Sequence, residues 1–277
     1  MKSLLKPLAL GSALAVAGCA QGAVGTMPGL PAAGAPSAIH DGGRGKLPQM
    51  LIRPAVSPAI YVFKGQPDAA SPTTGLVHVG GMFYGTTAGG GTDNLGAIYS
   101  VTTGGTETIM HSFTGKPDGE NSYAPLTDVN GTLYGTTYYG GKNNVGCIFS
   151  ITPSGTYKIV YSFKDNGKDA AEPQVAMTYD STNETLYGVS YRGGATGEGA
   201  IFALSLAGSK PKESVVYSFT GASDSPTDSN ALALFNGALY GTTPNGGTQN
   251  DGSIYKVVLS SRKESLVYSF KGIPDGA

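Results

Sequence analysis

The feature that most constrains this chain is a unit of about fifty residues that recurs four times. Each copy has a Tyr-Gly pair, and its tyrosines are spaced by 50, 53 and 53 residues: Tyr84, Tyr134, Tyr187 and Tyr240. A Gly-Gly pair follows each tyrosine, and then a small residue, an isoleucine and an aromatic residue, as in Gly146-Cys-Ile-Phe149. The last element, Tyr-Ser-Phe or a close variant, occurs five times. Since one such unit cannot bury both of its faces, neighbouring units must stack.

Each unit reads as four short strands. In the second copy the predicted strands are 124–129, 132–138, 147–152 and 157–163. The first two join at Asn130-Gly131, which is a strong signal for a two-residue hairpin turn, and Asn236-Gly237 repeats it. No segment shows an apolar period of 3.6 residues, and the chain contains 43 glycines. The predicted fold is therefore all-β, a kelch-like β-propeller of four-stranded blades.

The repeat also resembles a known family. Leu-Tyr-Gly-Thr-Thr, Gly-Gly, Asn-x-Gly-x-Ile-Phe and Tyr-Ser-Phe-x-Gly together resemble the bacterial tandem repeat called GloVer, over about residues 58–277. The third copy departs from the pattern at Val189-Ser190 and at Gly197, where the other copies have asparagine. The resemblance implies an exported repeat domain with one of several kinds of surface anchor, and it supplies no catalytic residues.

The N-terminus is typical of an exported lipoprotein. Lys2 and Lys6 precede an apolar stretch at 7–18, which is too short to span a bilayer and ends in Val16-Ala-Gly-Cys19. This ending resembles a lipobox, so the expected partner is a membrane, held through lipid on Cys19. Ala20, in place of aspartate, favours the outer membrane or the cell surface. We therefore expect a signal peptide at 1–18, a Gly/Ala/Pro-rich tether at 19–57 and the propeller at 58–277.

The order of the strands raises the question of how the ring closes. A lone fourth strand is predicted at 59–63, four complete sets follow it, and the sequence ends in a loop at 274–277. The lone strand would complete a blade whose other three strands are not in this sequence. Our expectation is that the natural protein continues and that further blades close the ring. The alternative is a closed four-bladed ring with one spare strand.

Two sets of loop residues are candidates for ligand binding, because alternating strand directions bring the second-to-third and fourth-to-first loops to one face. A carboxylate recurs in the fourth-to-first loops, either as a turn former or as a ligand: Asp68, Asp118, Asp169, Asp224 and Asp275. Other candidates vary from copy to copy: Tyr138, Tyr139, Tyr191, Arg192 and Asn245. The repeat does not require these varying side chains, which suit a carbohydrate or a peptide surface.

The composition and the motifs argue against several classes of function. Lys and Arg (18) nearly balance Asp and Glu (19), so no charge pattern for nucleic acid is present. We find no catalytic motif, no metal-ligand spacing and no cofactor motif. His111 and Cys147 occupy packing positions of the repeat. The preferred prediction is a binding module at the cell surface. The alternatives are a propeller enzyme of the lyase, hydrolase or lactonase kind, with His78 and Asp128 near the axis, and a structural part of a surface assembly.

Overall fold

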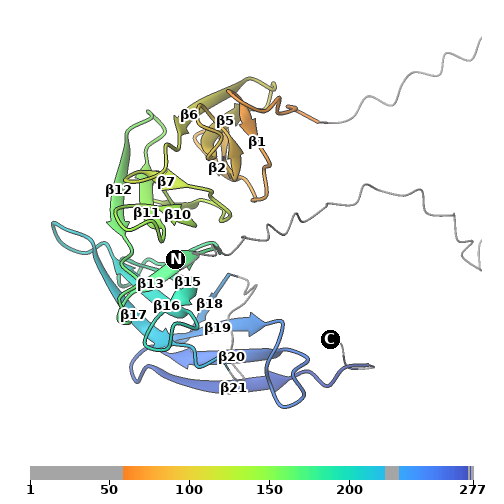
Figure 1. The fold of residues 1–277 in the computed structure, drawn as a ribbon, viewed down its shortest axis with the longest axis vertical. Coiled ribbons are helices and arrows are strands. Elements are labelled where there is room, and N and C mark those ends of the chain that lie inside the picture. The colour runs from red at the N-terminus through yellow and green to blue at the C-terminus, as the bar shows by residue number, and fades with distance from the viewer. Residues whose placement is uncertain (1–58, 222–230, 274, 276–277) are drawn as a thin grey trace, which may run out of the picture. The chain divides into compact units, whose positions relative to one another are not determined.

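The computed structural model describes residues 59–221, 231–273 and 275 of the chain. These residues form strands and loops, and none of them belongs to a helix that has the length and hydrophobicity of a membrane span. Four antiparallel sheets follow one another, from the orange end of the chain to the blue end (Figure 1). We call them blades 1 to 4 and name the strands of each blade A to D in chain order.

The strand bounds repeat closely from blade to blade. Blade 1 consists of β2 (Val77–Val79), β3 (Met82–Thr87), β5 (Ala97–Thr102) and β6 (Glu107–Ser112). Blade 2 consists of β8 (Thr127–Val129), β9 (Thr132–Thr137), β11 (Cys147–Ile151) and β12 (Tyr157–Ser162). Blade 3 consists of β14 (Thr178–Asp180), β15 (Thr185–Gly193), β16 (Ala200–Ser205) and β17 (Lys212–Ser218). Blade 4 consists of β18 (Ala233–Phe235), β19 (Ala238–Thr243), β20 (Ser253–Val258) and β21 (Lys263–Ser269).

Short strands also lie in the loops: β1 (Ala69–Ala70), β4 (Gly89–Gly90), β7 (Gly119–Glu120), β10 (Tyr139–Gly140) and β13 (Ala170–Pro173). The predicted hairpin turns are confirmed, since Asn130, Gly131, Asn236 and Gly237 all have positive φ. The A strands are shorter than predicted. In blade 2, β8 begins at Thr127, because the preceding residues belong to the loop that enters the blade.

The A strands of successive blades contact one another, β2 with β8, β8 with β14 and β14 with β18. Thr127 Oγ1 donates a hydrogen bond of 2.7 Å to the Met177 carbonyl, which joins blade 2 to blade 3. Thr178 Oγ1 makes the corresponding bond to the Leu232 carbonyl of blade 4. Inner strands that touch in sequence order, with the B, C and D strands paired outward from each, are the arrangement of a β-propeller. The predicted fold class is therefore confirmed.

The core consists of apolar layers between neighbouring blades. Between blades 1 and 2, Ile98 and Phe113 pack against Leu133 and Phe149, and all four are fully buried. The same positions fill the layers that follow: Ile148, Phe163, Leu186 and Phe202, then Ile201, Phe219, Leu239 and Tyr255. In each layer the phenylalanine that ends one blade contacts the C-strand aromatic of the next, with ring centroids 5.1–5.5 Å apart.

The glycine of each Tyr-Gly pair makes room for that C-strand aromatic ring. A Cβ atom added to Gly135 would overlap the ring of Phe149, and one added to Gly188 would overlap the ring of Phe202. The same relation holds for Gly85 with Tyr99 and for Gly241 with Tyr255. The glycine on strand B and the aromatic residue on strand C are thus two halves of one packing unit.

The prediction of a lone strand at 59–63 is wrong, because these residues are not part of any strand. A D strand forms by pairing with a C strand, and no described strand pairs with this segment. Phe63 nevertheless packs its ring on Tyr99, with centroids 4.8 Å apart. The side chain therefore occupies its repeat position although the backbone does not.

We expect Gly188→Ala to destabilise the protein by about 1–3 kcal/mol, because the new methyl group overpacks the layer that holds the fully buried Phe202. Urea-induced unfolding measures the change. The control is Gly75→Ala, since a Cβ at exposed Gly75 meets no atom within 4 Å. Equal unfolding midpoints for the two variants would contradict the proposed packing unit.

Candidate functional site

The described loops that enter blades 1, 2 and 3 are each joined to the B–C loop of the blade that they enter. β1 pairs with β4, β7 with β10, and β13 with the end of β15. The Gly-Gly pairs complete the connection, since the amide of Gly91 donates to the Asp68 carbonyl and that of Gly194 to the Asp169 carbonyl. The D–A and B–C loops therefore lie together, which places the candidate residues of both loops on one face.

The four described aspartates of this set turn inward and bond to the tyrosine or histidine that precedes their loop. Tyr61 Oη donates to Asp68, Tyr161 Oη to Asp169 and Tyr268 Oη to Asp275, over 2.6–2.8 Å. His111 occupies the tyrosine position in blade 1 and bonds to Asp118. Asp224 lies outside the described residues. Of the two interpretations left open by the sequence, these contacts favour the turn-forming one, since a carboxylate bonded within its own loop has less capacity left for a ligand.

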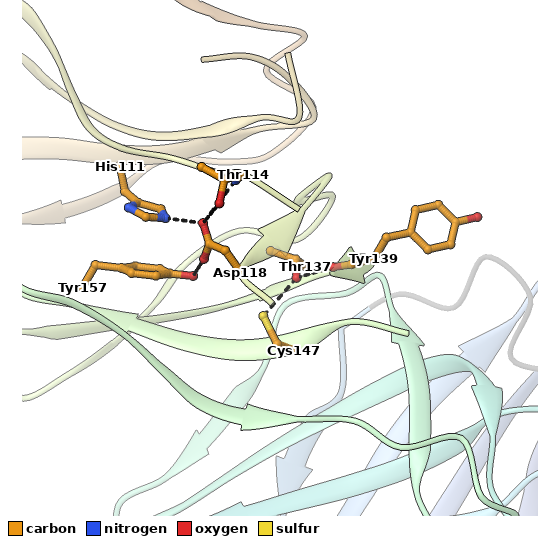
Figure 2. A network of polar contacts seen from close by, with 7 residues as sticks. All are labelled: His111, Thr114, Asp118, Thr137, Tyr139, Cys147 and Tyr157. Carbon is orange, nitrogen blue, oxygen red and sulfur yellow. Dashed lines mark hydrogen bonds and ion pairs between the residues drawn. The ribbon is translucent and has the colours of Figure 1, made fainter. Parts of the chain in front are cut away.

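Asp118 accepts hydrogen bonds from two blades (Figure 2). His111 Nε2 lies 2.9 Å from Asp118 Oδ2, and Tyr157 Oη of blade 2 donates to Asp118 Oδ1 over 2.7 Å. The His111 and Tyr157 rings stack with their centroids 3.6 Å apart. Burial alone would raise the pKa of Asp118, but the bonds from His111 and Tyr157 outweigh it and hold this pKa at about 2. The network fastens blade 1 to blade 2.

Cys147 lies next to this network and is inert (Figure 2). Its Sγ atom is fully buried and lies 3.1 Å from Thr137 Oγ1, which also donates to the Tyr139 carbonyl. Burial raises the pKa of the Cys147 thiol to about 12, so the nucleophilic thiolate is absent at neutral pH.

The repeated asparagines of the B–C loops form turns. Asn94, Asn144 and Asn250 have φ of 60–63°, and each side-chain oxygen accepts a bond from the first glycine of the Gly-Gly pair. Blade 3 has Gly197 at this place, also with positive φ. These asparagines therefore serve the loop conformation.

Three tyrosines meet on the loop face where blade 2 adjoins its neighbours, and we call Tyr123, Tyr138 and Tyr139 the tyrosine cluster. The Tyr138 ring is edge-on to both others, with centroids 4.5 Å from Tyr139 and 5.7 Å from Tyr123. Tyr123 is 41% exposed and Tyr139 is 36% exposed, whereas Tyr138 is half-buried between them. In Figure 2 the Tyr139 side chain points away from the Asp118 network. The cluster thus presents two accessible rings held by a third.

A carboxylate and a guanidinium group border the cluster. Tyr138 Oη donates to Glu172 Oε2 over 2.8 Å, and Arg192 Nε lies 3.7 Å from the same oxygen. Burial and then the Glu172 carboxylate raise the pKa of Tyr138, so its hydroxyl remains a donor. Glu172 is only 9% exposed and has a φ of 56°, which is unusual for a residue other than glycine. The Arg192 side chain extends into solvent.

The structure brings together Tyr138, Tyr139 and Arg192 of the predicted set. Tyr191 is half-buried and Asn245 is exposed on the same kind of loop, and among the described residues neither belongs to the tyrosine cluster. Tyr123 and Glu172 were not predicted. Both follow a recurring aspartate in a D–A loop and differ from the equivalent residues of the other loops, which is the signal that would have found them.

The pair considered for the enzyme alternative lies on the A strands. Asp128 Oδ1 accepts the Gly131 amide over 2.8 Å within its own hairpin turn, and the ring of exposed His78 lies 5.2 Å from that of Phe83. Within the described part of the chain, no group of three or more His, Cys, Asp or Glu side chains is placed to hold a metal ion.

The sequence profile of a family described as Gloeobacter/Verrucomicrobia repeat matches residues 71–277. Among curated protein sequences, none matches this chain significantly.

Solved structures with a similar chain trace include several bacterial proteins. TolB from Acinetobacter baumannii has 11% identity and a TM-score of 0.43, over 69% of this chain and 41% of that one. A putative TolB from Agrobacterium tumefaciens has 13% identity and a TM-score of 0.42, over 69% and 62%. The arabinanase Arb43A of Bacillus subtilis has 17% identity and a TM-score of 0.38, over 76% and 84%. This chain thus spans less than two thirds of either TolB chain, and likenesses this distant indicate no activity or ligand.

We expect Asp118→Asn to destabilise the protein by about 1–3 kcal/mol at neutral pH, because the half-buried donors His111 and Tyr157 lose their charged acceptor. The pKa of Asp118 is lowered in the folded state, so its contribution is present above about pH 4 and is lost as the pH falls toward 2. The stability difference between wild type and variant should therefore shrink in acid, as measured by urea unfolding at pH 7 and pH 2.5. The exposed Asp93→Asn is the control, and a difference that stays constant with pH would contradict the assignment.

Proposed function

The chain belongs to the Gloeobacter/Verrucomicrobia repeat family, and from this premise we propose that it is an exported, lipid-anchored β-propeller that binds carbohydrate at the cell surface. The tyrosine cluster is the proposed binding surface. The observation that supports it is the meeting of exposed aromatic rings with a carboxylate and a guanidinium group on the variable loop face.

The chemistry of this surface suits a sugar. A pyranose presents an apolar face that packs on an aromatic ring, as the exposed rings of Tyr123 and Tyr139 allow. Its hydroxyl groups need hydrogen-bond partners at the edge of the ring, and the exposed Arg192 guanidinium supplies donors there. Tyr138 is held by Glu172, so the rings are positioned before a ligand arrives. A peptide ligand is the alternative, and the same binding assays distinguish the two.

The anchor part of the proposal rests on the sequence alone. Val16-Ala-Gly-Cys19 and the tether at 19–57 both lie outside the described residues. A lipid chain on Cys19 contributes about 0.8 kcal/mol of membrane affinity for each buried CH₂ group. The proposed location is the outer membrane or the cell surface of a bacterium, with the propeller held away from the lipid by the tether.

The enzyme and surface-assembly alternatives have less support. Among the described residues, the side chains considered for catalysis are Asp128, which is bonded within its own turn, and His78, which lies on another blade. No contact among the described residues specifically favours an assembly role. The binding function is therefore the one that we propose.

We expect Tyr139→Ala and Tyr123→Ala each to weaken sugar binding by about 2- to 10-fold, because each removes one stacking ring. The detergent-solubilised full chain is screened on arrays of bacterial and plant oligosaccharides and of peptides, and the best ligand is titrated by calorimetry. Tyr139→Phe is the matched control, since it keeps the ring. Unchanged affinity in the double alanine variant would refute this surface, and binding only to peptides would refute the ligand class.

We expect Cys19→Ser to move the protein from the membrane fraction to the soluble fraction and to abolish its labelling by radioactive palmitate, because the lipid-bearing thiol is absent. Cys147→Ser is the matched control, since Cys147 is a buried thiol within blade 2 and its variant should stay with the membrane. A Cys19→Ser protein that still sediments with membranes would contradict lipid anchoring.

A further inference from the structure

A set of three polar side chains recurs where one blade adjoins the next, and we call it the interblade triad. It consists of the tyrosine or histidine that precedes a D–A loop, the aspartate of that loop and a residue of the next D strand. The described triads are Tyr61-Asp68-Glu107, His111-Asp118-Tyr157 and Tyr161-Asp169-Glu213. The triads thus have two compositions. Where the first position is tyrosine the third is glutamate, and where the first is histidine the third is tyrosine.

The two compositions differ in the number of donors. Asp118 lies between His111 and Tyr157, both of which bond to its oxygens. Asp169 accepts a bond from Tyr161 Oη at 2.7 Å, but its other neighbour, Glu213, has only acceptor oxygens when it is ionised. The Tyr161-Asp169-Glu213 triad therefore has one hydrogen-bond donor fewer than the His111-Asp118-Tyr157 triad when both carboxyl groups are ionised.

Two buried oxygen atoms without a hydrogen-bond partner indicate where the missing hydrogen would lie. Asp169 is 3% exposed, and its Oδ1 atom is buried with no hydrogen-bond partner. Glu213 Oε1 is likewise buried without a partner. Two adjacent carboxylates that are both ionised repel each other and leave buried acceptors unsatisfied, whereas one shared proton removes both penalties.

We propose that Asp169 and Glu213 share one proton in the folded protein and form a pH-sensitive lock between blades 2 and 3, which loosens when the proton is released. Release gives two carboxylates and transfers one proton to solvent. The other groups that face Glu213 are Tyr161, which donates to Asp169, and Lys164, whose ammonium lies 5.5 Å from the Tyr161 ring centroid. Lys164 is exposed, so solvent weakens its attraction for the pair.

The direction of the pH effect follows from the proton balance. Burial and then the Asp169 carboxylate raise the pKa of Glu213 to about 8, against about 4.3 for an unfolded glutamate. At a pH between these two pKa values, Glu213 is ionised in the opened state and keeps its proton in the folded state. The lock therefore becomes weaker as the pH rises through this window, by up to tenfold in the opening constant per pH unit.

The lock is connected to the tyrosine cluster through the chain. Asp169 immediately precedes β13, which contains Glu172, and the Asp169 carbonyl accepts the amide of Gly194 in the B–C loop of blade 3. Loosening at Asp169 is thus transmitted to the segment that holds Tyr138 in place. The lock itself does not depend on the proposed function. The expectation that sugar binding weakens at alkaline pH does rest on that function.

The experiment follows amide hydrogen exchange of the full chain at pH 5 to 9, expressed as protection factors for β13 and β17. In wild type we expect protection to fall more than tenfold between pH 5 and pH 8. Glu213→Gln keeps the shape, donates to Asp169 and does not titrate, so its protection should stay level. The matched control is Glu184→Gln, an exposed residue of blade 3, which should behave like wild type.

A second variant supplies the missing donor with a different side chain. Glu213→Tyr places at this position the residue type that bonds to Asp118 in the preceding triad, and its protection should also stay level between pH 5 and pH 8, below the ordinary pKa of a tyrosine. In wild type, carbon-13 NMR of the glutamate carboxyl groups should show one that titrates near pH 8 and is missing in Glu213→Gln. The proposal is overturned if Glu213 titrates near pH 4, if Glu213→Gln keeps the wild-type pH dependence, or if added Ca²⁺ abolishes that dependence. Because no ligand is involved, failure of the tyrosine cluster to bind sugar leaves this test intact.

Discussion

The contact of an aromatic ring with a glycine is the constraint on which the rest of this structure depends. Phe149 and Phe202 lie over Gly135 and Gly188 of the neighbouring strand, and the preceding blade closes each ring with a phenylalanine of its own. Close packing of this kind leaves little freedom in how one blade sits on the next. This one contact accounts for the period of the repeat, the pairing of strands B and C and the small residues around them.

Rigid blades allow the loops to vary. The D–A loops are tied to the next blade by short strand pairs and by the recurring aspartates, which bond inward. Side chains that take no part in these ties, such as Tyr139 and Arg192, are free to differ between blades. The tyrosine cluster therefore lies on a frame held by these ties, where the B–C loop of blade 2 carries two adjacent tyrosines, Tyr138 and Tyr139.

Much of this architecture was predictable because the repeat reports the packing directly. Four copies of Tyr-Gly predict blades and two Asn-Gly turns predict hairpins, and both are confirmed. The lone strand at 59–63 was predicted wrongly, since its motif records side-chain packing on Tyr99 and not a partner strand. Glu172 escaped prediction because its approach to Tyr138 depends on the path of a loop and on a positive φ, and neither follows from periodicity.

The two compositions of the interblade triad bear on how such a gene can change. His111 and Tyr157 belong to different repeats, as do Tyr161 and Glu213, so each repeat encodes the first half of one triad and the second half of another. Unequal crossing-over that deleted blade 2 would set His111 beside Glu213 and lose a matched tyrosine. A repeat that carries the histidine therefore keeps a complete set of hydrogen-bond donors around its aspartate only where the next repeat carries the tyrosine.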